Sequence, residues 1–220
     1  IVGGAGAVAS QLLQAVKSMT DKREDLSWPT EAELLAQFID AEYQTGFTSD
    51  EIPMNPGRCA WEVANFLKNK GRDWTVVCDG GDAAQWIKAA VKARRPGQIL
   101  NMGPNGTIGT GTGFTIGAWA ANRKPVLYYT GDGSFGFYPM EFDTFAKLGI
   151  PVVCVISNDS AWGMIKLSET LTNPGEVNER GHCGVDLCHM RPYEKMADLW
   201  DGYGEQVRRP EDIVPAIERA

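Results

Sequence analysis

Two carboxylates in this sequence have the spacing and the glycine neighbours expected of a metal site that holds a diphosphate. Asp132 lies in the segment Gly-Asp-Gly-Ser at 131–134, and Asp159 follows 27 positions later. An apolar run at 152–156 precedes Asp159, so both acids are predicted at the carboxyl ends of neighbouring strands. Mg²⁺ prefers oxygen ligands and links carboxylates to phosphate oxygens. The pattern therefore predicts a magnesium and diphosphate site.

A structural role is the alternative for Asp132, because Asp-Gly is a common turn in which the Asp side chain bonds nearby backbone. The spacing to Asp159 and a second glycine and acid segment at 79–82 favour the site. In open parallel sheets ligands bind beyond the carboxyl ends of the strands, and glycine lets backbone N–H groups approach a phosphate. We therefore expect residues 79–82 and 131–134 to face the same place.

The elements that would position these residues follow one regular pattern. Apolar runs at 74–78, 126–130 and 152–156 predict strands, and segments of helical periodicity lie between and after them. Strands of this kind that alternate with helices indicate an α/β fold, in which a parallel sheet has helices on both faces. Helices are predicted at 56–70, 83–93, 109–121, 139–148, 193–199 and 211–219.

The N-terminal quarter of the chain follows a different pattern. Residues 1–4 predict a short strand with a glycine turn, and residues 7–16 predict a helix with one apolar face. The polar segment that follows contains one helical stretch at 31–43. We interpret the chain as three parts, which are 1–17 as the C-terminal end of another α/β domain, 18–53 as a linker, and 54–220 as the diphosphate-binding domain.

Composition argues against two classes of protein. The formal net charge of −7 disfavours a protein that binds nucleic acid through a basic face. The sequence has no run of eighteen apolar residues, so no membrane span is predicted. The five cysteines are an odd number and no signal peptide precedes them, which favours reduced thiols and a cytoplasmic location.

One polar segment raises the question of a second metal. Two pairs, His182-Cys183 and Cys188-His189, offer zinc ligands, but the usual C-x2-C spacing is missing. We favour a polar loop over a structural zinc site. Residues 170–184 are predicted to form a loop that closes over the site and excludes water.

The order of the motifs resembles that of the acetohydroxyacid synthase superfamily of thiamine diphosphate enzymes. The cofactor motif of that family is similar to Gly131-Asp132-Gly133, 24 intervening residues, and Asn158-Asp159. The segment Gly-Thr-Ile-Gly at 106–109 is similar to the family segment that opens the helix before the first of these acids. The resemblance covers residues 54 to 220, and it implies thiamine diphosphate and Mg²⁺ as cofactors.

The resemblance also implies a role for each matching position. Asp132, Asp159 and the backbone carbonyl of Ala161 would ligate Mg²⁺. Ile108 would be the apolar wedge that bends the cofactor between its two rings, and the carbonyl of Gly106 would accept a hydrogen bond from the amino group of the cofactor. Together with Trp162, which is expected to face the substrate, Gly106 and Ile108 are the predicted catalytic positions. The other implied cofactor contacts are Gly81, Asp82, Ala83, Gly131, Gly133, Ser134, Trp162, Gly163 and Met164. The alternative for Ile108, Trp162 and Met164 is ordinary core packing.

The reaction is less specified than the cofactor. The family usually has Asn-Asn where this chain has Asn158-Asp159, and an Asn-Asp followed by Trp162 is similar to the branch of oxalyl-CoA decarboxylases and 2-hydroxyacyl-CoA lyases. The expected substrate is a 2-hydroxyacyl-CoA or a 2-oxo acid. Acetolactate synthesis, decarboxylation and a non-catalytic cofactor-binding subunit stay open. A nicotinamide-dependent dehydrogenase is disfavoured, because the glycines at 109–111 follow a loop and not a strand.

The resemblance also implies partners. The catalytic glutamate of the family lies in an N-terminal pyrimidine-binding domain that residues 1–220 do not contain. This chain alone is therefore expected to be inactive and to need that domain or a subunit that carries it. The resemblance further implies a homodimer or homotetramer.

Overall fold

The computed structural model describes residues 4–19, 27–70 and 73–220, which belong to two compact units, 1–41 and 42–220. In the first unit, helix α1 (Ala5–Met19) confirms the helix predicted at 7–16, and half of the surface of Leu12 on its apolar face is exposed. Helix α2 (Ser27–Phe47) confirms the predicted helical stretch at 31–43 and runs on into the second unit. The strand predicted at 1–4 lies outside the described residues except for Gly4, and the assignment of the first 53 residues to a domain end and a linker stays a prediction.

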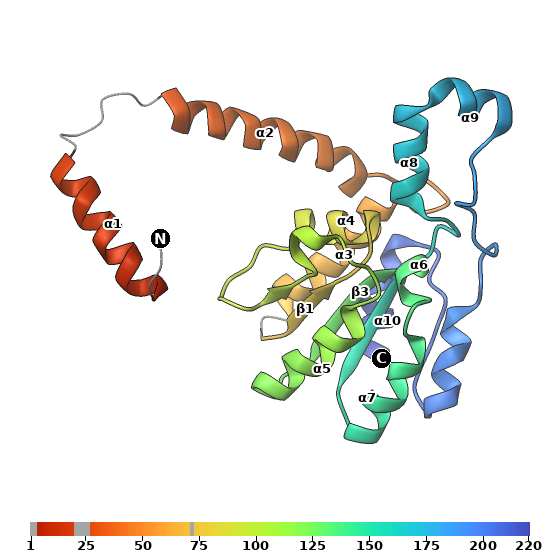
Figure 1. Ribbon diagram of the computed structural model, residues 1–220. Coiled ribbons are helices and arrows are strands. Elements are labelled where there is room, and N and C mark those ends of the chain that lie inside the picture. The colour runs from red at the N-terminus through yellow and green to blue at the C-terminus, as the bar shows by residue number, and fades with distance from the viewer. Residues whose placement is uncertain (1–3, 20–26, 71–72) are drawn as a thin grey trace. The chain divides into compact units, whose positions relative to one another are not determined.

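The second unit is built on a parallel sheet of four strands (Figure 1). They are β1 (Thr75–Cys78), β2 (Ile99–Leu100), β3 (Val126–Gly131) and β4 (Val152–Ser157), in the order β2-β1-β3-β4. All pairs are parallel, so the carboxyl ends of the strands share one edge, where Gly131 pairs with Ser157. The predicted α/β fold with a parallel sheet is confirmed.

Helices cover both faces of this sheet, because the side chains of each strand alternate between the faces. Leu127 and Tyr129 of β3 lie in a core with α3 (Pro56–Asn69), α4 (Asp82–Ala90) and α10 (Ile213–Arg219). Val126 and Tyr128 lie in a second core with α5 (Gly111–Asn122) and the first residue of α7 (Phe142–Leu148). Helix α3 begins at Pro56 behind the cap of Asn55, whose side chain accepts a hydrogen bond from Gly57 N at 2.9 Å.

The structure corrects three predictions of local structure. Helix α4 ends at Ala90 and not at 93, because Val91 turns into extended backbone and stays buried against the core. Residues 170–184 are not a loop throughout: α8 (Gly163–Thr172) extends into them and α9 (Pro174–Arg180) follows, with Pro174 at a first helical position that proline favours. The helix predicted at 193–199 is a 3₁₀ helix, η3 (Tyr193–Trp200).

The remaining elements are short. Helix α6 (Asp132–Phe135) follows β3 directly, and three further 3₁₀ turns are η1 (Gly103–Asn105), η2 (Pro139–Glu141) and η4 (Pro210–Asp212). Among the described helices, none combines the length and the apolar character that crossing a bilayer requires.

Candidate functional site

A cavity of about 240 Å³ opens where the strands end, and it brings the predicted site residues together. Its walls come from the turns after β1, β3 and β4 and from the segment before α5. The predicted positions that line it are Gly81, Asp82, Ala83, Gly106, Ile108, Gly131, Asp132, Gly133, Ser134, Asp159, Ala161, Trp162, Gly163 and Met164. Pro56, Ser157 and Ile165 complete the lining.

Asp132 is the most deeply placed acid of this cavity. Strand β3 ends at Gly131, and Asp132 begins α6 with only 3% of its surface exposed. Its Oδ1 accepts a hydrogen bond from Gly133 N at 2.9 Å, whereas its Oδ2 is buried and has no hydrogen-bond partner among the described residues. Burial first, and the charge of Asp159 second, raise the pKa of Asp132 to about 6. An unpaired buried carboxylate oxygen is costly, and a bound cation would remove that cost.

Asp159 lies in the turn that follows β4. Its Oδ1 accepts a hydrogen bond from Ala161 N at 3.2 Å, and Ser160 between them has φ +61°, in the left-handed region. The side chain of Asn158 accepts the Ser160 N–H at 3.2 Å. These bonds hold a tight turn in which Asp159 lies near enough to Asp132 to affect its pKa.

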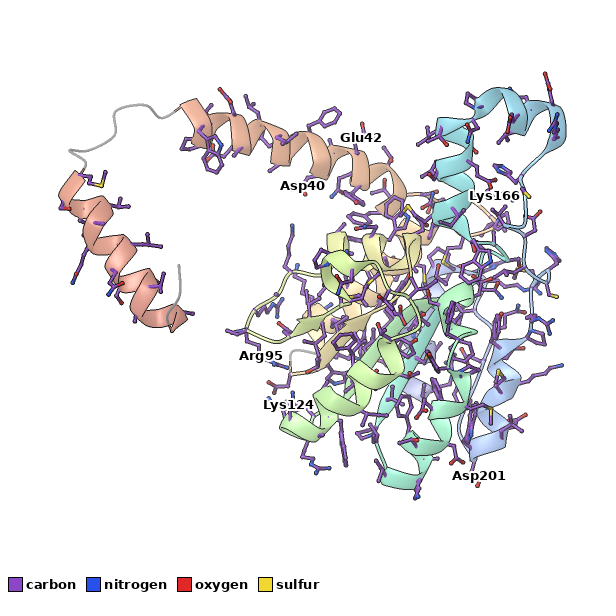
Figure 2. All side chains as sticks on the ribbon, in the orientation of Figure 1. Asp40, Glu42, Arg95, Lys124, Lys166 and Asp201 are labelled. Carbon is purple, nitrogen blue, oxygen red and sulfur yellow. The ribbon has the colours of Figure 1, made fainter. Side chains whose placement is uncertain are left out.

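A later segment, 185–191, braces this turn from outside. Trp162 N donates to Val185 O at 2.7 Å, Leu187 N donates to Ser160 O at 2.8 Å, and Ala161 forms a bridge with Asp186. Lys166, labelled on α8 in Figure 2, pairs with Asp186 at 2.9 Å. Hydrogen bonds within the turn and hydrogen bonds from residues 185–191 therefore both stabilise the turn that carries Asp159.

The turn after β1 supplies glycine backbone beside a helix start. Gly80 has φ +92°, and a Cβ added there would lie 2.9 Å from Ser134 Oγ, so the hydroxyl of Ser134 lies close to this turn. Gly81 precedes α4, whose first N–H groups are suited to an anion. Burial, and then the charge of Asp159, raise the pKa of Asp82 at the start of α4. The pocket therefore combines anion-binding backbone with crowded carboxylates, and a cation between them satisfies both.

The apolar side of the cavity is formed by Ile108 and Trp162. Ile108 is half-buried and lines the cavity beside Gly106, which has φ +64°. The ring of Trp162 covers Gly133 so closely that a Cβ there would lie 2.7 Å from a ring carbon. Phe137 meets the same ring at 6.1 Å between centroids, with the planes at 76°. A flat ligand ring would find apolar contacts on this side.

A family model described as the C-terminal TPP binding domain of thiamine pyrophosphate enzymes matches residues 79–220. This chain belongs to that family. The match begins at the turn after β1 and covers every strand end that lines the cavity. It confirms the predicted resemblance, and the individual site roles stay predictions.

Relatives within the family carry different activities in their names. A probable acetolactate synthase of Mycobacterium bovis is 34% identical over 172 residues, which are 78% of this chain and 30% of that protein. A 2-hydroxyacyl-CoA lyase 2 of Caenorhabditis elegans is 34% identical over 148 residues, 65% of this chain and 22% of that protein. Oxalyl-CoA decarboxylase of Escherichia coli is 27% identical over 171 residues, 77% and 29%. The chain spans less than a third of the length of these relatives.

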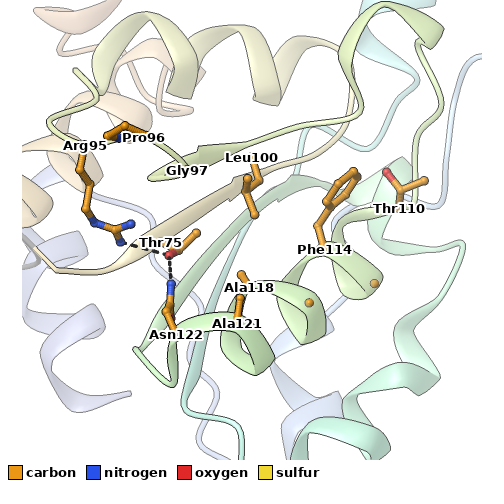
Figure 3. Close-up of a pocket in the computed structure, with 12 residues that line it drawn as sticks. Thr75, Arg95, Pro96, Gly97, Leu100, Thr110, Phe114, Ala118, Ala121 and Asn122 are labelled. Carbon is orange, nitrogen blue, oxygen red and sulfur yellow. Dashed lines mark hydrogen bonds between the residues drawn. The ribbon is translucent and has the colours of Figure 1, made fainter. Parts of the chain in front are cut away.

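A larger cavity, of about 620 Å³, lies elsewhere in this thiamine pyrophosphate enzyme domain (Figure 3). It runs along α5 from Thr110 to Asn122, between that helix and the segment before β2. At one end, Arg95 Nη2 and Asn122 Nδ2 both donate to Thr75 Oγ1, at 3.3 Å each. No acid is among its lining residues in the described part of the chain.

The histidine and cysteine pairs lie outside the carboxylate cavity. His182 Nδ1 is 3.1 Å from Glu169 Oε2, and Arg191 Nη2 donates to Cys188 Sγ at 2.9 Å. In the described ranges, no three His, Cys, Asp or Glu side chains gather as a metal cluster. Three acids line the carboxylate cavity, Asp82, Asp132 and Asp159, and the role of the Ala161 carbonyl as a further ligand stays a prediction.

Sequence reasoning missed three residues of the site. Pro56 and Ser157 line the cavity, and Ser157 could have been found as the last residue of a predicted strand. Pro56 begins a helix far from the acids in sequence, so no local signal indicates it. Asp79 was noted only as part of an acidic turn, but the structure buries it completely beneath the segment that carries Ile108.

Proposed function

We propose that this chain supplies the diphosphate and Mg²⁺ half of the site of a thiamine diphosphate-dependent enzyme. The enzyme breaks or forms a C–C bond next to a carbonyl, and its substrate is a 2-hydroxyacyl-CoA or a 2-oxo acid. The observation that carries the proposal is the buried, unpartnered Oδ2 of Asp132, which lies in one cavity with Asp159 and two glycine turns.

The residues present fit both parts of this cofactor pair. Asp132, Asp159 and the Ala161 carbonyl offer the oxygen ligands that Mg²⁺ prefers. The start of α4, directly after Gly81, would offer backbone N–H groups to a diphosphate. The unpaired oxygen of Asp132 would gain a partner when the metal binds, which makes metal binding favourable at neutral pH.

The chain also orients what it binds. Ile108 and Trp162 add apolar surface to a cavity that also holds the acids, so a molecule with a charged tail and flat rings would find a partner for each part. Thiamine diphosphate supplies, when bound, the electron sink that C–C cleavage beside a carbonyl requires. Phe137 packs against the ring of Trp162 and supports it.

The substrate class rests on the resemblance in the metal turn. Asn158-Asp159 with Trp162 favours an acyl-CoA substrate, and relatives named 2-hydroxyacyl-CoA lyase 2 and oxalyl-CoA decarboxylase support it. Acetolactate synthesis is the second candidate, because a relative with that name is equally similar and is aligned over more of the chain. We further propose that a pyrimidine-binding domain or subunit completes the site, that the assembly is a homodimer or homotetramer, and that it is cytoplasmic.

The test measures cofactor binding and activity on the same purified protein. Thiamine diphosphate is titrated with and without Mg²⁺, and turnover is followed with a 2-hydroxyacyl-CoA, oxalyl-CoA and pyruvate. Asp132→Asn should abolish the Mg²⁺-dependent binding, whereas the control Asp143→Asn, an exposed acid on α7, should not. Absence of Mg²⁺-dependent binding in the unaltered protein would refute the proposal. Binding without turnover, in the presence of the pyrimidine-binding partner, would support a non-catalytic subunit.

A further inference from the structure

Asp79 is an acid that the proposed function does not use and that the structure surrounds with donors. It follows β1 directly and none of its surface is exposed. Gly80 N donates to its Oδ1 at 2.6 Å, and Gly109 N donates to the same oxygen at 3.0 Å. Gly111 N and the hydroxyl of Tyr128 donate to its Oδ2 at 2.8 and 3.2 Å. Each oxygen of this buried carboxylate therefore has two donors.

Two of these donors belong to a segment thirty residues downstream. Gly109 directly follows Ile108, which lines the cavity. Gly111 begins α5 two residues later. A carboxylate at the end of β1 thus fixes the backbone that leads out of the cavity and into the helix. Charge-assisted hydrogen bonds to a buried carboxylate are stronger than neutral ones, so this link is stiff.

Close packing keeps the same backbone from taking another path. A Cβ added to Gly109, at φ +83°, would lie 2.5 Å from Phe137 Cβ, and one added to Gly111 would overlap the ring of Tyr128. Only glycine lets the segment approach these rings, and the approach brings the N–H groups within reach of Asp79. Packing and hydrogen bonds therefore specify one position for the segment 109–111.

We propose that Asp79 is a positioning residue for cofactor binding. Through Gly109 and Gly111 it sets where the adjoining Ile108 lies in the cavity. This inference rests on the proposed function, because it assumes that the cavity holds thiamine diphosphate. It separates two parts of one site: Asp132 and Asp159 hold the charged tail, and Asp79 sets the wall that contacts the rings.

Asparagine at this position would remove one bond and keep the shape. Its single carbonyl oxygen can still accept from Gly80 and Gly109, but its NH₂ group would face the Gly111 N–H, and two donors cannot bond each other. The hydroxyl of Tyr128 can turn to accept from that NH₂ group. The substitution Asp79→Asn is thus expected to weaken the link between β1 and the start of α5 while it leaves the turns around Asp132 and Asp159 unchanged.

The experiment compares two probes on three proteins. Thiamine diphosphate and inorganic pyrophosphate, each with Mg²⁺, are titrated by calorimetry into the unaltered protein, Asp79→Asn and Tyr128→Phe. Asp79→Asn should weaken thiamine diphosphate binding by about tenfold, the value of one hydrogen bond to a charged group, and pyrophosphate binding by less than about twofold. Tyr128→Phe removes a hydroxyl from the same carboxylate but no bond to the segment, and it should bind both probes as the unaltered protein does.

Equal losses for the two probes, or no loss, would overturn the role of Asp79. If the unaltered protein binds neither probe, the proposed function fails instead. A second measurement needs no variant: amide hydrogen exchange at Gly109 and Gly111 in the unaltered protein should be slow, as for amides of the sheet. Exchange at the rate of an exposed loop would contradict the inference even if Asp79→Asn does not fold.

Discussion

Asp79 and Asp132 follow the last residues of two adjacent strands, and both are almost fully buried, yet the chain treats them in opposite ways. Every oxygen of Asp79 accepts hydrogen bonds from backbone or from Tyr128. One oxygen of Asp132 has no hydrogen-bond partner in the part of the chain that the structure describes. A buried acid whose donors are all internal is expected to stabilise the fold, whereas one with an unpaired oxygen is expected to destabilise the empty protein and to favour a bound cation. The two acids thus follow neighbouring strands in turns that both contain glycine. Asp79 belongs to the scaffold, whereas Asp132 belongs to the proposed binding site.

The sharpest test of this difference is Asp132→Ala. It removes the acid with the unpaired oxygen, so Mg²⁺-dependent affinity for thiamine diphosphate should fall by about a hundredfold or more, since a charged ligand to the metal is lost. The melting temperature of the metal-free protein should stay the same or rise. Calorimetric titration and thermal unfolding measure the two effects. A large loss of metal-free stability would place Asp132 with Asp79 as a scaffold residue.

The reverse result is expected for Asp79→Ala. It leaves the N–H groups of Gly109 and Gly111 buried without an acceptor, so the free energy of unfolding should fall by about 3 kcal/mol. Urea unfolding of the metal-free protein measures this loss. An unchanged unfolding midpoint would show that the hydrogen bonds of Asp79 do not stabilise the fold.

The comparison also predicts how pH acts on the empty site. The pKa of Asp132 is raised to about 6, above its value of about 3.9 in an unfolded chain, so the folded state favours the protonated acid. This contribution to stability is fully present below about pH 4 and is lost as the pH rises through about 6. Metal-free thermal unfolding across this range should show the decline, and Asp132→Asn should remove it. Mg²⁺ affinity should rise over the same range, because the metal binds the ionised acid.

The smallest effect is expected at Ser134. Its hydroxyl lies near Gly80 in the turn region and offers one neutral hydrogen bond to a phosphate. Ser134→Ala should weaken thiamine diphosphate and pyrophosphate binding by the same factor, about threefold to tenfold, without a change in stability. Thr144→Val on α7 is a matched control that also removes a hydroxyl. If only thiamine diphosphate binding is weakened, Ser134 contacts the rings of the ligand and not its diphosphate tail.

The acids of the site could be predicted because each follows an apolar run. Such a run predicts a buried strand, and the polar residues after it mark the carboxyl end of that strand. Because the two strands were predicted to be parallel neighbours, Asp132 and Asp159 were expected to lie close together. Strand β2 has only two residues, and α6 has four, so neither leaves a periodic signal. Helix α9 was not predicted, because the segment 170–184 is polar and contains several glycines.

The role of Asp79 depends on contacts that no local pattern contains. Its donors at 109 and 111 come from thirty residues away, and their approach depends on the rings of Phe137 and Tyr128. The brace of 185–191 on the metal turn is equally non-local. Sequence therefore indicated which residues meet at the site, while the bonds that hold them in place required the structure.

The pairing of Gly131 with Ser157 has a consequence for ion choice. The acids come one and two residues after this pair, so their spacing starts from the distance between adjacent strands, about 4.8 Å. Asp132 is buried in the sheet edge and cannot retreat, whereas Asp159 is exposed on its turn. An ion with longer metal–oxygen bonds, such as Ca²⁺, would have to displace the Asp159 turn and, with it, the brace that the turn is bonded to. Selection against larger ions would thus result from backbone hydrogen bonds that are lost at the carboxyl end of β4.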